Sequence, residues 1–258
     1  MPYIEGIETV EEELHGYQVT TVQVRSELAA ETLKKPLGTY ITIETRETPD
    51  KYMEIDEIGE CLAEVLDRVL RPHYHGRLCI CGIGNRDLPA DALGPEVVRN
   101  LPLKLYSAAG VKGNFCDVCS IAPGTPWTSN INTETIVNGV VKEIGANCVL
   151  LVDSLVTKGP SKLFRTIQQS AAGGTNPFLS DEKADWSALG VPIISLGIPT
   201  GISLSGLFPD ANPGGDVFTS VNSPNIVAAA GRIIAYAILR TCWPTQSKAE
   251  CAALSGAV

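Results

Sequence analysis

Two aspartates stand where an α/β fold places its chemistry. Asp153 directly follows the apolar run 148–152, and Asp91 closes the loop after the apolar run 78–83. Working sites of open α/β sheets lie at the carboxyl ends of strands, and carboxylates are rarely buried unless paired. We therefore expect both side chains to face a cleft. Of two neighbouring carboxylates, one keeps a proton; the ionised one can draw a proton from water, and the protonated one can polarise a scissile carbonyl.

The same residues also allow a purely structural interpretation. Asp91 lies near the expected start of a helix, where an aspartate commonly caps the backbone. Asp153 follows a strand, where an aspartate commonly forms a turn. Spacing alone leaves both interpretations open.

Other catalytic motifs are missing from the sequence. The pair Gly82 and Gly84 lacks the third glycine of a dinucleotide-binding loop, because Asp87 occupies that position. The sequence contains no Gly-Lys-Ser/Thr phosphate loop, no Gly-x-Ser-x-Gly elbow and no His-Glu-x-x-His motif. A Cys–His nucleophile that uses His73 or His75 remains open, although nothing favours it.

The eight cysteines are scattered and do not form a disulfide framework. Cys116 and Cys119 form the one suggestive pair, but a structural zinc site needs a second pair or two histidines. No histidine follows them in the chain. We interpret them as ordinary thiols and expect no metal and no cofactor.

Composition limits the classes of partner. The 258 residues suit one large α/β domain or two small ones, and the formal net charge of −9 disfavours nucleic acid but tolerates a basic protein. The most apolar stretch, 226–239, is too short and too interrupted to cross a membrane. No secretory leader is visible at the N-terminus, so the cytoplasm is the expected location.

Hydrophobic periodicity predicts the elements that carry these residues. Strands are expected at 17–24, 39–44, 78–83, 148–152 and 191–198, and helices at 26–35, 54–71, 133–144 and 224–240, with a further helix starting near Asp91. Short apolar strands that alternate with helices predict an α/β fold, a single domain with a mostly parallel central sheet flanked by helices. Residues 199–222 are expected to form a long functional loop.

One loop carries a specific resemblance. Residues 82–95 read GIGNRDLPADALGP, which resembles the GLGN-x-x-x-TPDALGP signature of the spore germination endopeptidases. Further segments resemble that family in the same order: KKPLGTYITIE (34–44), NTETIVNGVV (132–141), LLVDSL (150–155), TIQ (166–168) and LGVPIISLGIPT (189–200). The resemblance covers residues 17–240.

The resemblance implies a fold shared with hydrogenase maturation proteases, and an endopeptidase that degrades small acid-soluble spore proteins. It carries the two catalytic aspartates onto Asp91 and Asp153. We expect Asn85 and Arg86 to shape the loop and Glu134 to add a polar contact. The glycines Gly82, Gly84 and Gly94 are expected either to make the turn or to let the backbone approach substrate. Self-association as a homo-oligomer and location in the spore core or forespore are also implied.

The sequence departs from the family in several places. It begins where the family's propeptide would already have ended, and residues 172–178 replace a PGSGVGN stretch. Two alternative functions therefore remain open beside that of an endopeptidase. One is a maturation protease that senses a metal on its partner, with the two aspartates as ligands. The other is a binding module on the same fold that has no catalytic activity.

Overall fold

The structure is a computed structural model that describes residues 5–45, 55–104, 110–171, 186–207 and 217–256. Within these residues, nine strands join in one sheet in the order β1-β2-β3-β7-β8-β6-β4-β5, and β9 pairs with β8. Their bounds are β1 Ile7–Leu14, β2 Tyr17–Val24, β3 Gly38–Glu44, β4 Arg77–Ile83, β5 Asp117–Gly124, β6 Cys148–Thr157, β7 Thr166–Ala171, β8 Ile193–Ser203 and β9 Val217–Phe218.

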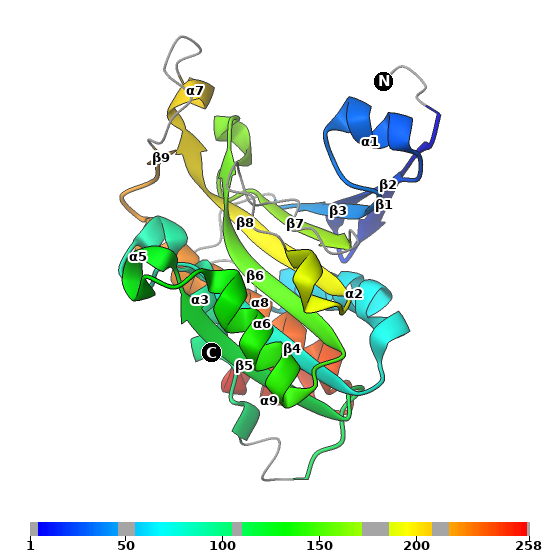
Figure 1. Ribbon diagram of the computed structural model, residues 1–258, viewed down its shortest axis with the longest axis vertical. Helices are drawn as coiled ribbons and strands as arrows, with labels where there is room; N and C mark the ends of the chain where they lie inside the picture. The colour runs from blue at the N-terminus through cyan, green and yellow to red at the C-terminus, as the bar shows by residue number, and fades with distance from the viewer. Residues whose placement is uncertain (1–4, 46–54, 105–109, 172–185, 208–216, 257–258) are drawn as a thin grey trace.

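The sheet has a parallel part and an antiparallel part (Figure 1). Strands β8, β6, β4 and β5 pair in parallel. Strands β1, β2, β3 and β7 pair antiparallel and extend the sheet beyond β8. The predicted α/β architecture is confirmed, with the parallel strands forming one half of a sheet that is mixed as a whole.

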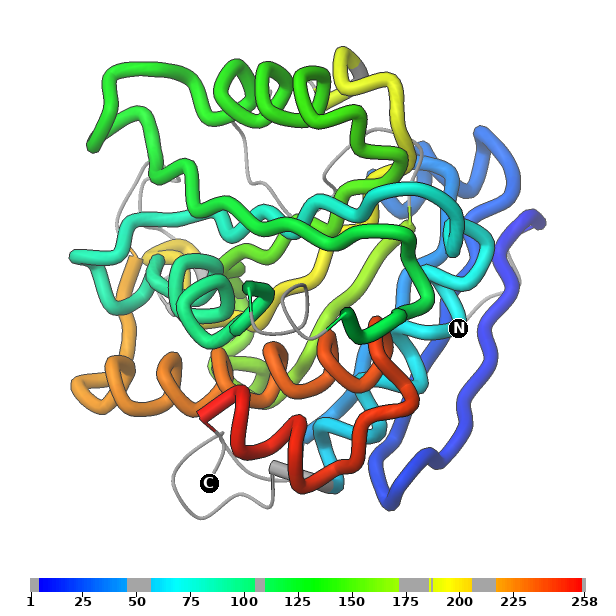
Figure 2. Tube along the Cα trace, turned by 90° about the horizontal axis from the view of Figure 1, so that it is seen from below, coloured from blue at the N-terminus to red at the C-terminus, as the bar shows by residue number. Residues whose placement is uncertain are grey.

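Helices cover both faces of the parallel part. The α-helices are α1 Glu27–Leu33, α2 Ile55–Leu70, α3 Leu93–Arg99, α5 Pro126–Ser129, α6 Thr133–Ile144, α7 Leu204–Leu207, α8 Ser223–Cys242 and α9 Lys248–Leu254, and the short 3-10 helices are η1 Arg71–His73, η2 Pro89–Asp91, η3 Pro160–Lys162 and η4 Trp186–Leu189. Figure 2 shows α6 on one side of the sheet and α8 with α9 on the other.

Strand β4 shows why its sequence is apolar throughout. Leu78 and Ile80 face the large core formed with α2, α3 and α8, whereas Cys79 and Cys81 face the smaller core under α6. A strand that is buried on both faces needs apolar side chains in both registers. The continuous run 78–83 therefore predicted a central strand correctly.

Helix α8 lies in the large core. By length and composition it could cross a membrane, but 78% of its apolar window is buried inside the molecule. It packs against α2 and α3. The helix is longer than the stretch 226–239 that the sequence analysis judged too short to cross a membrane. It is the burial of its apolar residues, rather than its length, that fits a core helix.

Several predicted bounds were too short. Strand β6 does not end before Asp153 but continues through it to Thr157, and β8 continues to Ser203 into the expected loop 199–222. Within that loop α7 and β9 are also ordered, while residues 208–216 lie outside the described residues. Residues 172–178, where the sequence departs from the family pattern, lie outside them as well.

Several elements escaped the sequence reasoning, among them β1, β5 and α9. Strand β1 is rich in glutamate and mostly exposed, so it lacks the apolar alternation that marks a half-buried strand. Strand β5 is also largely half-buried or exposed, at the opposite edge of the sheet. Helix α9 begins with a capping box between Ser247 and Glu250, a sequence signal that could have revealed it.

Candidate active site

Glycines hold the Asp91 loop against the end of β4. Gly84 has φ +130°, and a Cβ atom there would lie 1.9 Å from the carbonyl oxygen of Asp91. A Cβ at Gly82 would lie 2.1 Å from the carbonyl oxygen of Gly94. Both contacts are closer than any side chain allows, so these glycines let η2 and α3 pack directly on the strand. The geometry matches the turn-forming alternative of the sequence analysis.

Asp91 is half-buried at the end of this loop. Its Oδ2 atom accepts a hydrogen bond from the backbone N–H of Asn85 at 2.7 Å. Burial raises the pKa of Asp91 above its ordinary value, and the Asn85 hydrogen bond opposes that shift. The carboxylate is thus held by its own loop rather than by a cation.

Two polar contacts tie the Asp91 segment to the neighbouring strands. The Thr200 hydroxyl on β8 donates to the carbonyl oxygen of Ala90. The backbone N–H of Leu93 donates to the Ser154 hydroxyl on β6 at 3.4 Å. The position of Asp91 therefore depends on β4, β6 and β8 together.

Asp153 lies inside β6, next to the point where β4 departs. Its register partner on β8 is Gly197, while the last residue of β6 paired with β4 is Val152. The Asp153 side chain is only 6% exposed, which corrects the expectation that a carboxylate at this position would be open to a cleft. Strand β6 continues beyond it to Thr157 and stays paired with β8, so Asp153 lies within the sheet rather than at the end of a strand.

The two carboxyl groups interact electrostatically. Burial raises the pKa of Asp153 well above its ordinary value, and the charge of Asp91 raises it further. The backbone N–H of Ser154 donates to Asp153 Oδ1 at 2.7 Å and opposes the shift. The structure thus brings the two sequence-predicted aspartates together, with Asp153 the one that holds a proton more tightly.

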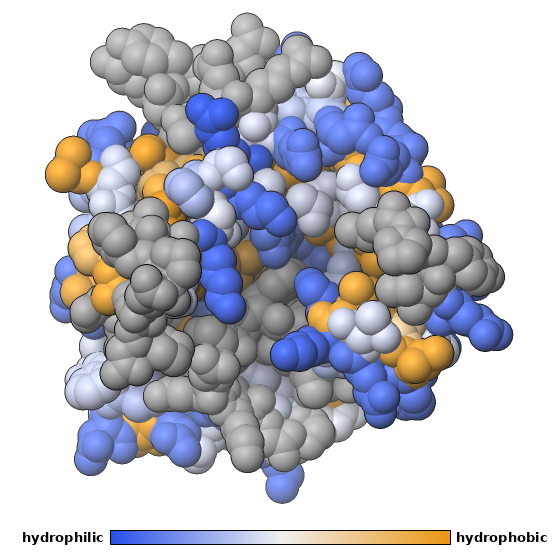
Figure 3. All heavy atoms as spheres, turned by 90° about the horizontal axis from the view of Figure 1, so that it is seen from above, coloured by the Kyte–Doolittle hydropathy of each residue, from blue (hydrophilic) through white to orange (hydrophobic). Residues whose placement is uncertain are grey.

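A pocket of about 520 Å³ opens beside Asp91 at the carboxyl ends of β6 and β8. Its lining residues are Leu88, Pro89, Ala90, Asp91, Ser154, Leu155, Val156, Thr200, Gly201, Val217, Thr219 and Ser223. Asp153 is adjacent to this lining through Ser154 but is not part of it. Figure 3, seen from this end of the molecule, shows a hollow bordered by hydrophilic and hydrophobic side chains.

The other predicted site residues lie at different places. Asn85 is half-buried, and its side-chain oxygen accepts a hydrogen bond from the Asp87 N–H at 3.0 Å, so it shapes the loop. Arg86 is exposed on the same loop. Glu134 lies in the first turn of α6 and lines a separate pocket of about 180 Å³ with Trp186. The structure therefore does not bring Glu134 into the Asp91 pocket.

Sequence reasoning did not single out the four hydroxyl residues that line the pocket, Ser154, Thr200, Thr219 and Ser223. The Thr219 hydroxyl donates to the carbonyl oxygen of Thr200 at 2.6 Å and ties the chain after β9 to β8. Ser154 and Thr200 lie inside the segments that resemble the family, and that resemblance could have pointed to them. No sequence signal pointed to Thr219. Within the described part of the chain, no group of three His, Cys, Asp or Glu side chains is arranged to hold a metal ion.

Comparisons with known proteins address the family directly. The family profile described as germination protease matches residues 2–212. The germination protease of Caldanaerobacter subterraneus subsp. tengcongensis is 29% identical over 205 residues, which are 76% of this chain and 63% of that protein. The germination protease of Clostridium perfringens is 30% identical over 211 residues, 79% of this chain and 64% of that protein.

One solved structure is also similar, a [NiFe] hydrogenase maturation protease from Thermococcus kodakarensis. It has a TM-score of 0.40 and 19% identity, and the match covers 67% of this chain and 98% of that one.

The fold and the site define an α/β protein with two coupled carboxyl groups beside a pocket at the strand ends. With the profile match over most of the chain, this chain belongs to the germination protease family. It spans less than two thirds of the length of the curated relatives it matches.

Proposed function

We propose that this protein is an endopeptidase in which Asp91 and Asp153 activate water for attack on a peptide bond. The observation that carries the proposal is the electrostatic coupling of the two carboxyl groups beside the pocket. Two carboxyl groups with displaced pKa values suit general acid–base catalysis, because one is charged while the other is protonated. Membership of the germination protease family supports the same reaction.

The environments of the two residues suggest separate roles. Asp91 lines the pocket and is the more exposed of the two, so it acts as the ionised base that takes a proton from water. Asp153 is more deeply buried and holds its proton, so it acts as the acid that polarises the scissile carbonyl oxygen. The water oxygen then bonds to the carbonyl carbon, the C–N bond breaks, and the peptide nitrogen leaves as an amine with the proton that Asp91 took from the water.

The substrate follows from the resemblance rather than from the pocket. We propose small acid-soluble spore proteins, hydrolysed inside the spore, as the protein substrates. The acidic chain, with net charge −9, tolerates a basic protein of this kind. Self-association as a homo-oligomer is proposed on the same basis, and sedimentation of the purified protein would test it.

The test is peptide release from a purified small acid-soluble spore protein. Wild type is compared with Asp91→Asn, Asp153→Asn and the matched control Asp87→Asn, which changes an exposed carboxylate of the same loop. We expect discrete fragments from wild type and Asp87→Asn, and losses of about 10² to 10⁴ in rate for the other two. Circular dichroism establishes that each variant is folded.

Two other results would point to the alternative functions. Cleavage that appears only after nickel is added, and is lost in the same two variants, would indicate a metal-sensing maturation protease. Binding of the spore protein by a folded wild type that releases no fragments would indicate a module without catalysis. Equal activity of wild type and Asp153→Asn would refute the two-carboxylate mechanism.

A further inference from the structure

A second cluster of reactive groups lies away from the aspartates, on the two strands at the parallel edge of the sheet. Cys79 on β4 and Cys119 on β5 are register partners in a parallel pair. Both contact the small core under α6, so their side chains lie on the same face of the sheet. The Cys119 thiol donates to the carbonyl oxygen of Leu78 at 3.5 Å, and each of the two neighbouring thiols shifts the pKa of the other.

This spacing is compatible with a covalent bond. Neighbouring strands lie about 4.7–4.9 Å apart, and the Cα atoms of a disulfide lie roughly 4.4–6.8 Å apart. The pair that the sequence suggested, Cys116 and Cys119, does not fit this range. Residues 117–119 are extended at about 3.3 Å per residue, which separates those two Cα atoms by roughly 10 Å.

The two sulfur atoms differ in access and in reactivity. Cys79 is fully buried, whereas Cys119 is half-buried and lines a pocket of about 560 Å³ beside Asp117. The neighbouring Cys79 thiol lowers the pKa of Cys119, and the charge of Arg77 acts in the same direction, while burial and Asp117 oppose it. A thiolate is the reactive form of cysteine, so Cys119 is the sulfur that an oxidant meets first.

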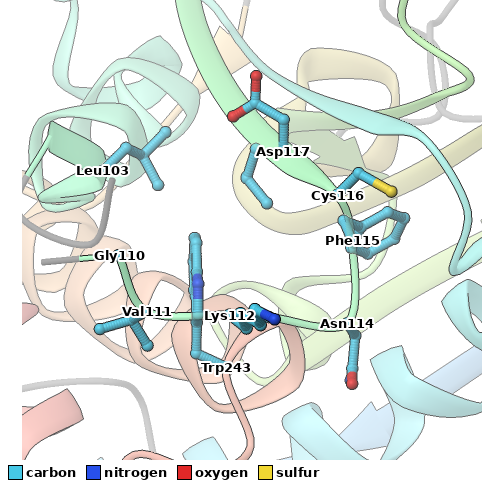
Figure 4. A pocket seen from close by; sticks show the side chains of 11 residues that line it. Leu103, Gly110, Val111, Lys112, Asn114, Phe115, Cys116, Asp117 and Trp243 are labelled. Carbon is cyan, nitrogen blue, oxygen red and sulfur yellow. The ribbon is translucent and has the colours of Figure 1, made fainter. Parts of the chain in front are cut away.

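Cys116 occupies a different surface. Figure 4 shows it beside Phe115 on the segment that leads into β5, around a neighbouring pocket of about 470 Å³. Its thiol is exposed. Because that pocket lies at the amino end of β5, both pockets are remote from the carboxyl strand ends that hold Asp91 and Asp153.

We propose that Cys79 and Cys119 form a peroxide-sensitive thiol pair that closes to a disulfide between β4 and β5. The Cys119 thiolate attacks hydrogen peroxide; an S–O bond forms, the O–O bond breaks, and the departing hydroxide takes up a proton as water. The Cys79 sulfur then attacks the Cys119 sulfenic acid; an S–S bond forms, the S–O bond breaks, and a second water carries away the Cys79 proton. The two thiols together lose two electrons, and one peroxide is reduced to two waters.

Peptide mapping tests this directly. The protein is treated with hydrogen peroxide, its free thiols are blocked with iodoacetamide, and it is digested with trypsin. Cys79 then lies in peptide 78–86 with Cys81, and Cys119 lies in peptide 113–142 with Cys116. We expect these two peptides to become cross-linked, and dithiothreitol to separate them.

Variants assign the sulfur atoms. The double variant Cys81→Ala with Cys116→Ala keeps the cross-link, and adding Cys119→Ala to it abolishes the cross-link. Cys119→Ala is the deciding variant because Cys119 is only half-buried. Since Cys81 is fully buried, circular dichroism must first establish that the double variant is folded. Hydrogen exchange gives an independent measure, since the disulfide slows exchange of the β5 amides and dithiothreitol restores it.

Two results would overturn the proposal. In the first, peroxide oxidises Cys119 to a sulfinic acid, while Cys79 remains a free thiol that iodoacetamide alkylates once the protein is unfolded. In the second, the cross-link disappears in the double variant, which would assign it to Cys81 or Cys116. Neither result bears on proteolysis, because the Asp91 pocket contains no cysteine.

Discussion

The negative charge of Asp91 raises the pKa of Asp153, which is buried in the neighbouring strand. Burial raises the pKa of Asp91 as well. The protonation of Asp153 therefore depends on the charge of Asp91. Several measurable consequences follow from this coupling.

Removing the charge of Asp91 should lower the pKa of Asp153. In Asp91→Asn the neighbouring negative charge is gone, while the burial of Asp153 is retained. Carbon-13 NMR of labelled aspartate side chains measures the titration of Asp153 in both proteins. Asp87→Asn is the control and should leave it unchanged. An identical Asp153 titration in wild type and Asp91→Asn would contradict the coupling.

Stability should fall with rising pH because of Asp153. Its pKa is higher in the folded state than in the unfolded chain, so the folded state binds more protons. The stabilisation that protonated Asp153 contributes is fully present below about pH 4, the ordinary pKa of an aspartate. It is lost as the pH rises through the pKa that Asp153 has in the folded state. Urea unfolding of wild type and Asp153→Asn at several pH values measures the difference. The wild type should lose stability relative to the variant as pH rises; a constant difference would contradict this sign.

The pH dependence of proteolysis should have two limbs. Activity falls on the acid side when Asp91 gains a proton, and on the alkaline side when Asp153 loses its proton. Because burial raises the pKa of Asp91, the acid limb lies above that of an ordinary aspartate. A profile of kcat/KM against pH measures both limbs. An acid limb at or below about pH 4 would contradict the assignment of Asp91 as base.

Gly84→Ala should displace the Asp91 segment. The backbone has φ +130° there, and the new Cβ would meet the Asp91 carbonyl oxygen at 1.9 Å. We expect a loss of about 1–3 kcal/mol in the free energy of unfolding. Gly139→Ala is the control, because a Cβ at that helical position meets nothing within 4 Å and should stabilise by about 0.5–1 kcal/mol. Equal effects of the two changes, measured by urea unfolding, would refute this account.

Thr200→Val should loosen η2. The change removes the hydroxyl that donates to the Ala90 carbonyl oxygen and leaves that contact unmade. A loss of about 0.5–1.5 kcal/mol is expected, whereas Thr200→Ser retains the hydroxyl and most of the stability. Thermal unfolding with the proteolysis assay measures both effects. If the serine variant is as damaged as the valine variant, the contribution comes from the methyl group instead.

Local signals in the sequence predicted three of the four parallel strands and one helix that covers them. Helix α6 occupies the predicted residues 133–144, because its apolar positions recur with helical spacing between a polar start and Gly145. The apolar runs that became β4, β6 and β8 were recognised for the same reason. Their carboxyl ends then placed Asp91 and Asp153 at one end of the sheet.

Pairing between distant strands carried no such local signal. The sequence did not reveal that β7 joins β3 antiparallel, because pairing partners are chosen by the whole fold. The burial of Asp153 was missed because β6 continues through a charged residue. The contact of Cys79 with Cys119 joins strands 40 residues apart, whereas motif reading searched for thiols within a few residues of each other.

The acidic strand β1 bears on how copies of this protein can meet. It is the outermost strand of the antiparallel part, and it carries Glu8, Glu11, Glu12 and Glu13. Exposed strand edges recruit other strands unless charges discourage them. A second copy that paired through β1 would set glutamate beside glutamate, which is unfavourable. The glutamates that made this strand hard to predict from the sequence therefore also disfavour edge-to-edge pairing of a second copy through β1.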